Sequence, residues 1–298
     1  MRVLLFGASG FIGAHVHRLL SADERVSEVD APGRARHDLL AGDPADLAAL
    51  IRQARPDAVI NCTGALVGSA YQLIRANTGV TAALIDAVAE AAPAARLVRL
   101  GSAGEYGPVP HGHAVAEDDP AAPVSEYGLS HLAGTRLIEL AGAAGRVDGL
   151  SVRVFNPIGP GLAEENLLGR AARLLRAALA AGESAITLGD LSAYRDFVDV
   201  RDVAAAVVAG ALAPELPHRV VNAASGRAVT SREVVRLLAA EAGFTGEIRE
   251  SGGGPARSAA VSWMRGDPAR AAAMLGWAPG YDLAASVKAV WADGPSAR

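Results

Sequence analysis

The chain has 298 residues, 51% of them hydrophobic, and a formal net charge of -4 at pH 7. This length and apolar content can bury the core of one large or two modest domains, and the weak negative charge offers no argument for binding nucleic acid. The single cysteine, Cys62, excludes a disulfide within the chain. No apolar run approaches the roughly 18 residues that span a bilayer, and no basic-then-apolar leader precedes the first predicted strand. We therefore expect a cytoplasmic protein without a membrane partner.

The first predicted element is a buried strand over residues 2–6, which a glycine turn and a helical pattern follow. The turn carries Gly7, Gly10 and Gly13, with Phe11 and Ile12 before the last glycine. Glycines at this spacing allow a tight turn, bring backbone amides close to a pyrophosphate and let the helix pack on the strand. The order of strand, glycine turn and helix predicts a dinucleotide site, and the alternative is a purely structural turn.

Strand-like and helical segments then alternate along the chain. Strands are predicted at residues 26–30, 58–62, 97–101 and 150–155, and helices at 45–55, 70–91 and 130–144. Such alternation is typical of a doubly wound α/β fold, with a parallel sheet between two layers of helices.

The pattern becomes less regular at residues 156–161, where we place the entry to a smaller mixed α/β lobe. Later predicted elements are a helix at 164–181, a strand at 195–200 that returns to the first lobe, a helix at 203–212, a strand at 220–223 and a helix at 231–241. The predicted nucleotide-binding domain is 1–155 plus 189–223. The predicted substrate-binding lobe is 156–188 plus 224–298.

The chemistry-bearing segment is Tyr127-Gly-Leu-Ser-His131, which has the form of a Tyr-x-x-x-Lys motif with histidine in place of lysine. Lys288 is the one lysine of the chain. With Ser102, the glycine motif, the segments 153–161 and 195–203, and Gly189-Asp190-Leu191, it makes the chain resemble the extended short-chain dehydrogenase/reductase (NAD-dependent epimerase/dehydratase) family. The resemblance covers nearly the whole chain and is closest to the GDP-4-keto-6-deoxymannose reductases of the nucleotide-sugar branch.

The resemblance implies that Tyr127 donates a proton and that Ser102 holds the substrate oxygen. The family's lysine lowers the pKa of the tyrosine, which is near 10 in water, and grips the nicotinamide ribose. Neutral His131 can donate one hydrogen bond in its place, and protonated His131 could mimic lysine below about pH 6.5. Three readings stay open: a working reductase in which His131, the positive charge of the nicotinamide ring or a water relay takes the role of the lysine; a slowed or redirected enzyme; and a cofactor-binding protein with little turnover.

The expected reaction is reduction of a 4-keto nucleotide-linked deoxysugar or a similar ketone by hydride transfer. Related dehydratases carry acidic residues just after the serine, where this chain has Ala103 and Gly104, so dehydration is disfavoured. Glu105 either binds substrate or supports the loop. A nucleotide-sugar 4-epimerase and an enzyme of a secondary-metabolite ketone remain alternatives.

Cofactor choice depends on the end of the second predicted strand. Asp30 is placed to accept hydrogen bonds from the adenosine ribose and to repel a 2′-phosphate, whereas Arg34 or Arg36 could clamp that phosphate or be solvated. We expect NAD(H), with NADP(H) as the close second. By resemblance, Asp38 and Leu39 hold the adenine.

Further contacts follow from the resemblance. The segment Cys62-Thr63-Gly64 lies beside the cofactor, although Cys62 itself is expected to be a buried structural thiol. The substrate-binding candidates are Asn156, Arg195 and Arg257, and Arg195 has the alternative of an ion pair with Asp196 or Asp199.

Two further expectations concern metals and partners. We predict no metal site, because His111 and His113 have no acidic or cysteine residue at a ligand spacing. By resemblance, the helices at 71–91 and 130–144 form a homodimer interface.

Overall fold

The structure, a computed structural model, describes residues 1–252 and 260–294. Its centre is a six-stranded parallel sheet in the order β2-β1-β3-β4-β5-β9. The strands are β1 (Arg2–Phe6), β2 (Glu28–Asp30), β3 (Ala58–Asn61), β4 (Arg96–Ser102), β5 (Asp148–Val154) and β9 (Val220–Ala223). The strand order reverses between β1 and β3, a switch point at which α/β sheets bind ligands. The predicted doubly wound fold is confirmed.

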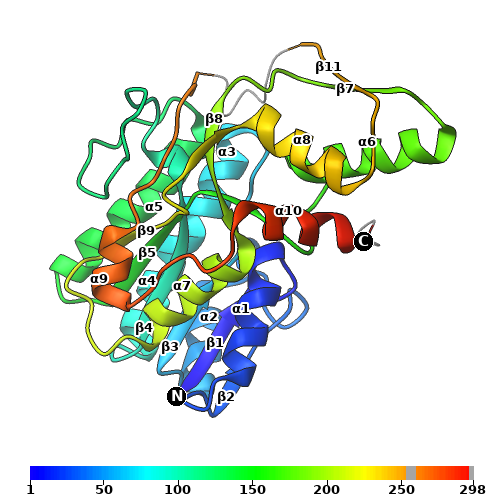
Figure 1. Ribbon diagram of the computed structural model, residues 1–298. Helices are drawn as coiled ribbons and strands as arrows, with labels where there is room; N and C mark the ends of the chain where they lie inside the picture. Colours follow the sequence, from blue (N-terminus) through cyan, green and yellow to red (C-terminus); the bar gives the residue numbers. More distant parts are fainter. Residues whose placement is uncertain (253–259, 295–298) are drawn as a thin grey trace.

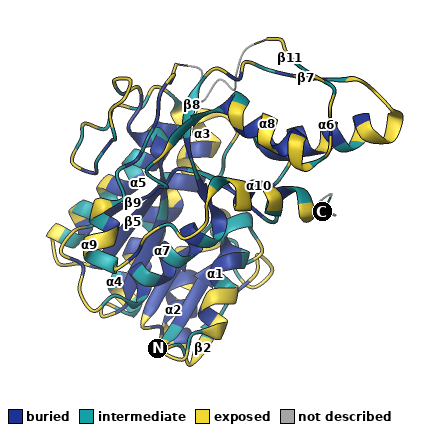
Figure 2. Ribbon diagram, viewed as in Figure 1, coloured by how far each residue is buried: buried dark blue, intermediate teal, exposed yellow. Residues whose placement is uncertain are grey.

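Helices cover both faces of this sheet, whose strands are almost entirely buried (Figures 1 and 2). One face carries α1 (Phe11–Ala22) and α7 (Val200–Leu212), and the other carries α2 (Pro44–Ala54), α4 (Val80–Ala91) and α5 (Glu126–Ala143). Strand β1 shows how the sequence builds two cores. Leu5 packs with α1 and α7, whereas Leu4 and Phe6 pack with the other three helices, because successive side chains of a strand point to opposite faces.

Helix α5 begins four residues before its predicted start. Ser125 caps it, with Oγ accepting a hydrogen bond from Gly128 N at 3.2 Å, and the polar and glycine residues that follow hide the helical period in the sequence. Tyr127 is therefore in the first turn of α5 and His131 is one turn further on. Residues at this spacing lie on the same face of a helix.

The helix predicted at residues 70–91 is interrupted by a π-helical segment. It consists of α3 (Ala70–Leu73), η1 (Ile74–Gly79) and α4. Within η1, the Asn77 amide accepts from Ala65 N at 2.8 Å and donates to Ala65 O at 3.0 Å and to Ser130 Oγ at 2.9 Å. One side chain thus joins the loop after β3 to helix α5.

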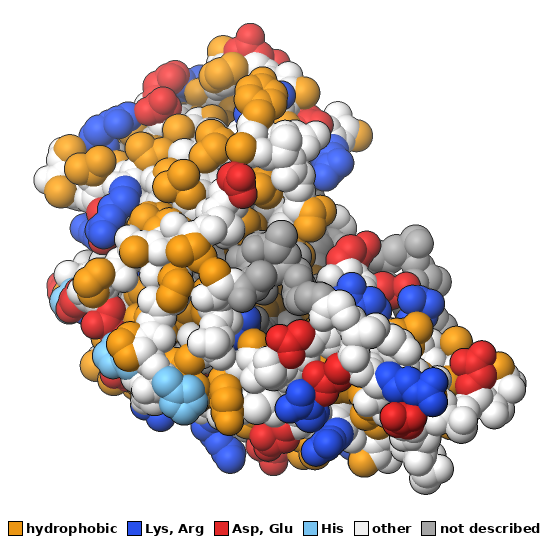
Figure 3. Space-filling view, turned by 90° about the horizontal axis from the view of Figure 1, so that it is seen from above, with side chains coloured by type: hydrophobic (Ala, Val, Ile, Leu, Met, Phe, Trp, Pro, Cys, Tyr) orange, Lys and Arg blue, Asp and Glu red, His pale blue; other side chains and the backbone are white. Residues whose placement is uncertain are grey.

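The second lobe lies beside the carboxyl ends of the large sheet (Figure 1). Its helices are α6 (Leu167–Ala181), α8 (Ser231–Glu241) and α10 (Leu283–Ala292), which share one hydrophobic core. Two small sheets complete it: β6 (Asn156–Ile158), β8 (Tyr194–Asp199) and β10 (Ala228–Thr230) form one, and β7 (Ala185–Leu188) and β11 (Glu247–Glu250) form the other. Seen from above, acidic and basic side chains are interspersed over the surface (Figure 3).

Strand β8 departs from its expected place. It was predicted to return to the first lobe, but it pairs with β6 and β10. The helix that follows it, α7, does pack on the large sheet, and α9 (Ala269–Leu275) packs near α7 and β9. The division of the chain into two lobes at the predicted boundaries stays a prediction. In the described part of the chain, no helix has both the length and the apolar character that a membrane crossing requires.

Candidate active site

The glycine turn after β1 forms a cradle made of backbone. Gly7 has φ +80°, and a Cβ atom on it would lie 2.8 Å from the carbonyl carbon of Cys62. A Cβ atom on Gly13 would lie 1.9 Å from Gly7 O, so neither position accommodates a side chain. The first turn of α1 carries no acidic side chain, and its N-cap residue, Gly10, has no side chain to accept a hydrogen bond from the first-turn amides. The amide groups of this turn can therefore receive an anion such as a pyrophosphate.

A cleft of about 1210 Å³ opens beside this cradle, at the carboxyl ends of β1, β3, β4 and β5. Its volume exceeds the range of most single-ligand sites, so it can hold a dinucleotide together with a second ligand. The predicted residues that line it are Gly10, Phe11, Ile12, Cys62, Thr63, Gly64, Ser102, Tyr127, His131, Asn156 and Arg195. The fold thus brings cofactor, catalytic and substrate candidates of distant segments into one cavity. The predicted cofactor residues that do not line it are Gly7, Gly13, Asp30, Arg34, Arg36, Asp38 and Leu39.

The residues predicted to choose the cofactor lie at the end of β2 and in the loop after it. Asp30 accepts a hydrogen bond from Arg36 at 2.6 Å, in a partly exposed ion pair. Arg34 is exposed. Asp38 accepts from Leu40 N at 2.8 Å, and Leu39 packs against the core beneath α2 and α4. Asp30 and Arg36 thus form an ion pair, in which the carboxylate can accept a hydrogen bond from a ribose and the guanidinium can donate one.

The loop after β3 is held by side chains of its own. Asn61 Oδ1 accepts from Thr63 N at 3.0 Å and from Thr63 Oγ1 at 2.6 Å. Cys62 lies between Asn61 and Thr63, and burial raises the pKa of its thiol to about 12. A thiol with this pKa stays protonated near neutral pH and is a poor nucleophile. Cys62 follows the end of β3 and lies half-buried at the wall of the cleft, whereas the sequence predicts a buried thiol inside the strand.

Ser102 lies where β4 ends and the one-turn helix η2 (Ala103–Glu105) begins. Its Oγ accepts from Gly104 N at 3.1 Å, which fixes the side chain and leaves the hydroxyl proton for another acceptor. A Cβ atom on Gly104 would lie 3.4 Å from Ser102 Oγ and 3.5 Å from the ring of Tyr127. These are ordinary van der Waals distances, so Gly104 lies beside both the serine and the tyrosine.

Tyr127 and His131 pack edge to face, with ring centroids 4.6 Å apart. The His131 side chain is buried, and burial lowers its pKa to about 3, with the positive charge of Arg99 as a second cause. His131 is therefore neutral at neutral pH. The idea that a protonated His131 imitates lysine below pH 6.5 is wrong, since the imidazole is surrounded by protein and by another cation.

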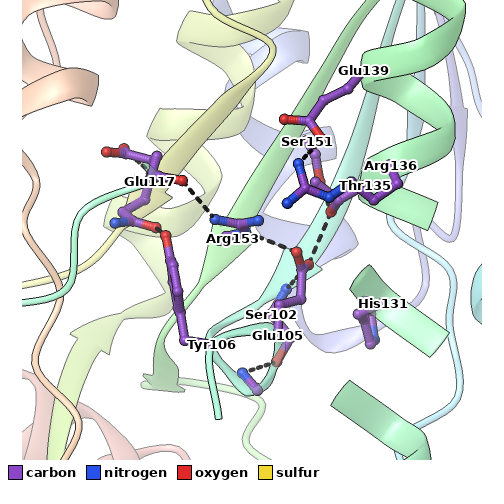
Figure 4. A network of polar contacts seen from close by, with 12 residues as sticks. Ser102, Glu105, Tyr106, Glu117, His131, Thr135, Arg136, Glu139, Ser151 and Arg153 are labelled. Carbon is purple, nitrogen blue, oxygen red and sulfur yellow. Dashed lines mark hydrogen bonds and ion pairs between the residues drawn. The ribbon is translucent and has the colours of Figure 1, made fainter. Parts of the chain in front are cut away.

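Glu105 belongs to a buried network and does not line the cleft (Figure 4). It is 0% exposed, and its carboxylate accepts from Ser102 N at 2.9 Å, Thr135 Oγ1 at 3.0 Å and Arg153 Nε at 2.8 Å. These contacts correct its assignment to the substrate-binding set and favour the alternative reading, support for the loop. Glu105 holds the backbone from which Ser102 extends.

Arg99 and Arg153 of this network were missed by the sequence reasoning. Both are buried within strands, at 3% and 1% exposure. A charged residue inside an otherwise apolar strand is the signal that could have identified them, because buried charges need dedicated partners. Their partners come from α5, β5 and η2 and cannot be read from local sequence.

Asn156 and Arg195 face the cleft from the second lobe. Asn156 Nδ2 donates to Asp196 O at 3.1 Å, and Arg195 Nη1 donates to Tyr194 O at 2.8 Å. Of the two acidic residues considered as partners of Arg195, Asp196 accepts from Ser225 and from the backbone of residues 226 and 266, and Asp199 accepts from residue 201. Arg257 lies outside the described residues. Within residues 1–252 and 260–294, no three metal-ligating side chains of His, Cys, Asp or Glu gather.

Comparison with known proteins adds independent findings. Residues 3–224 match the model of the NAD dependent epimerase/dehydratase family. The chain is similar to a dTDP-6-deoxy-L-talose 4-dehydrogenase (NAD(P)(+)) of Kitasatospora kifunensis, at 40% identity over 97% of this chain and 94% of the relative. It is 30% identical to a GDP-6-deoxy-D-mannose reductase of Pseudomonas aeruginosa, over 98% and 96%. Among solved structures, RMD from Pseudomonas aeruginosa complexed with NADPH has a TM-score of 0.88 at 28% identity and 99% coverage of both chains.

Proposed function

Because this chain belongs to the NAD-dependent epimerase/dehydratase family, we propose that it interconverts a carbonyl and a hydroxyl group at carbon 4 of a nucleotide-linked 6-deoxyhexose. It is an NAD(P)-dependent oxidoreductase or epimerase of that family, and the proposal concerns its substrate and reaction. The single observation that carries the proposal is that Ser102 and Tyr127, both beside Gly104, line the cleft that the glycine turn opens into.

The residues present fit a dinucleotide. Gly7 and Gly13 form a cradle that any Cβ atom would fill, the first-turn amides of α1 suit the pyrophosphate, and Asp30 suits the ribose hydroxyls. When bound, the reduced nicotinamide supplies the hydride. The exposed Asp30–Arg36 pair suits both nucleotides, since Asp30 can accept from a ribose hydroxyl and Arg36 can donate to a 2′-phosphate.

Tyr127 and Ser102 divide the work at the substrate oxygen. In reduction, the carbonyl carbon gains a hydride and its oxygen gains the phenolic proton of Tyr127; in oxidation, the phenolate takes that proton back. Ser102 donates its hydroxyl proton to the same oxygen, because Gly104 N already occupies one of its acceptor sites. The two groups hold the oxygen from two sides.

The substrate class is supported by the second lobe and by the relatives. Arg195 and Asn156 line the cleft from the second lobe, and the donors of a guanidinium match the oxygens of a diphosphate. The relative with 40% identity is named for a dTDP-linked 6-deoxy sugar. We propose that Arg195 contacts the diphosphate and that Asn156 contacts the sugar.

We also propose a homodimer through the helices that carry Tyr127 and the π-helical segment. Apolar side chains are exposed there: Tyr71 is 70% exposed, Leu129 52% and Leu140 67%. Light scattering after gel filtration tests the assembly, and a monomer at micromolar concentration would contradict it.

The proposed reaction is tested by following NADH and NADPH at 340 nm from pH 5.5 to 9 with dTDP-, GDP- and UDP-linked 4-keto-6-deoxyhexoses and the corresponding alcohols. We expect turnover with at least one pair, and a loss of roughly 100-fold to 10,000-fold in kcat for Tyr127→Phe. Tyr281→Phe, at an exposed tyrosine that does not line the cleft, is the matched control. Conversion of the sugar with no net absorbance change would identify a 4-epimerase instead. No conversion of any sugar would overturn the proposed substrate class.

A further inference from the structure

His131 stands where the family resemblance places a lysine beside Tyr127. Ionised Tyr127 is the base of the oxidation direction, and a phenolate next to apolar walls needs a nearby positive charge. His131 is neutral, and Lys288, the one lysine of the chain, is exposed on α10 and does not line the cleft. Arg99, a buried cation on the neighbouring strand β4, can supply such a charge.

Arg99 lies directly behind His131. Its Nη2 is 3.3 Å from His131 Nδ1, and its Nη1 donates to Thr135 Oγ1 and Ser151 Oγ, both at 3.0 Å. A guanidinium has donors only, so the hydrogen bond requires an unprotonated Nδ1. These acceptors are all neutral, and they satisfy the guanidinium without cancelling its charge.

The surrounding charges leave a positive excess. Arg99 and Arg153 are both buried, and the carboxylate between them, Glu105, forms its ion pair with Arg153 at 2.8 Å. Burial lowers the pKa of Arg99, while the negative charges of Glu105 and of ionised Tyr127 raise it. Coulomb attraction is mutual, so Arg99 stabilises the phenolate to the same extent.

We propose that Arg99 is a positioning residue that supplies, from behind the His131 ring, the fixed positive charge that stabilises the phenolate of Tyr127. The inference rests on the proposed function for the role of Tyr127 in turnover, but the electrostatic link itself does not. Arg99 does not line the cleft and acts through the electric field. The neutral imidazole separates the two groups and orients the guanidinium through Nδ1.

This arrangement explains why position 131 is not a lysine here. A lysine ammonium at that position would meet the guanidinium of Arg99 inside the protein, and two like charges in contact are costly. Arg99 on β4 and His131 on α5 therefore act together. The arginine supplies the positive charge and the neutral histidine accepts its hydrogen bond, where the family has a single lysine.

Other charged or titratable groups line the cleft with Tyr127 or lie close to Arg99. They come from α5, η2, β5, the loop after β3 and the second lobe: His131, Glu105, Arg153, Cys62, Glu165 and Arg195. Glu126, its neighbour on α5, is exposed. The test must therefore change the charge of Arg99 alone.

The first test measures phenolate formation by Tyr127 directly. Absorbance at 295 nm is followed from pH 6 to 11 for the full-length chain, with and without NAD+, and the curve of the Tyr127→Phe variant is subtracted. We expect Arg99→Met to raise the midpoint by about one pH unit or more, and Arg99→Lys to shift it less. An unchanged midpoint in Arg99→Met would overturn the proposal, whatever the substrate of the enzyme is.

Two controls separate charge from structure. Arg96→Met removes another buried arginine of β4, which binds Asp148 at 2.6 Å, and should leave the midpoint of Tyr127 unchanged; an equal shift there would overturn the specific role of Arg99. Ser151→Asp places a carboxylate against Arg99 without removing it and should raise the midpoint, whereas Ser151→Asn should not. This pair also serves if Arg99→Met does not fold.

The second test moves the positive charge from position 99 to position 131. Arg99→Met should reduce kcat in the oxidation direction at pH 7.5 by roughly tenfold or more, with recovery at high pH, and adding His131→Lys should restore activity at pH 7.5. A double variant that is no better than Arg99→Met, although it is folded and binds NAD+, would contradict this expectation. If no substrate is found, the proposed function fails, and the titration still decides the role of Arg99.

Discussion

The two halves of the cleft are built by different means. The cofactor half is backbone geometry: Gly7 and Gly13 are fixed by contacts with peptide groups of the same turn and of the next strand. The catalytic half depends on side chains: Glu105 and Arg99 are held by partners from α5 and β5, and Glu105 in turn holds Ser102. The cofactor half therefore tolerates almost no increase in side-chain size, whereas the catalytic half is sensitive to the loss or gain of a side-chain charge.

The largest effect is expected from adding one carbon to the cofactor half. In Gly13→Ala the new Cβ atom would lie 1.9 Å from Gly7 O, so the turn must shift and NAD(H) affinity should fall at least 100-fold, with a lower melting temperature. Gly33→Ala, where nothing lies within 4 Å, is the control. Titration of NADH fluorescence measures the affinity, and unchanged binding by Gly13→Ala would break the comparison.

The charge sensitivity of the catalytic half is tested by Glu105→Gln. The amide keeps the shape but leaves buried Arg153 without its counter-charge, which should cost about 3 kcal/mol of unfolding free energy. Urea unfolding measures the difference. Glu139→Gln removes a surface partner of Arg136 and should cost less than about 1 kcal/mol. Equal losses in the two variants would show that the buried network is not special.

A smaller effect concerns the dependence of stability on pH. The folded pKa of His131, about 3, lies below the ordinary value of 6.5, so the unfolded chain binds this proton first. The contribution of neutral His131 to the free energy of unfolding is fully present above pH 6.5. It is lost as the pH falls toward 3, by about 1.4 kcal/mol per pH unit. Between pH 7.5 and 5, His131→Gln should therefore lose less stability than the natural chain. His218→Gln, at an exposed histidine, should follow the natural slope.

The smallest effect is expected at the rim of the cofactor half. Arg36→Ala removes the partner of Asp30 and should weaken NADP(H) by roughly tenfold, the value of one charged hydrogen bond, while changing NAD(H) less. Arg34→Ala is the neighbouring control. A loss of NADP(H) affinity in Arg34→Ala alone would transfer the 2′-phosphate contact to that residue.

The same contrast explains what sequence reasoning reached. The glycine turn, the alternation of strands and helices and the position of Ser102 follow from local spacing and from resemblance, because each lies within a few residues of its own signal. Glu105 and Arg99 could not be interpreted this way. Glu105 is paired with Arg153, 48 positions away, and Arg99 with Ser151, 52 positions away, so their roles exist only once β4, β5 and α5 have come together.

The π-helical segment at residues 74–79 has a mechanical consequence. Its Asn77 grips both backbone groups of Ala65 and, through Ser130, the helix that carries Tyr127, so the loop beside the cofactor and the catalytic helix move as one part. Removing one residue from this segment would give a regular helix but rotate Asn77 by about 100°. The hydrogen bonds of Asn77 with Ala65 and Ser130 would break, and nucleotide binding at the loop would no longer be coupled to the position of Tyr127.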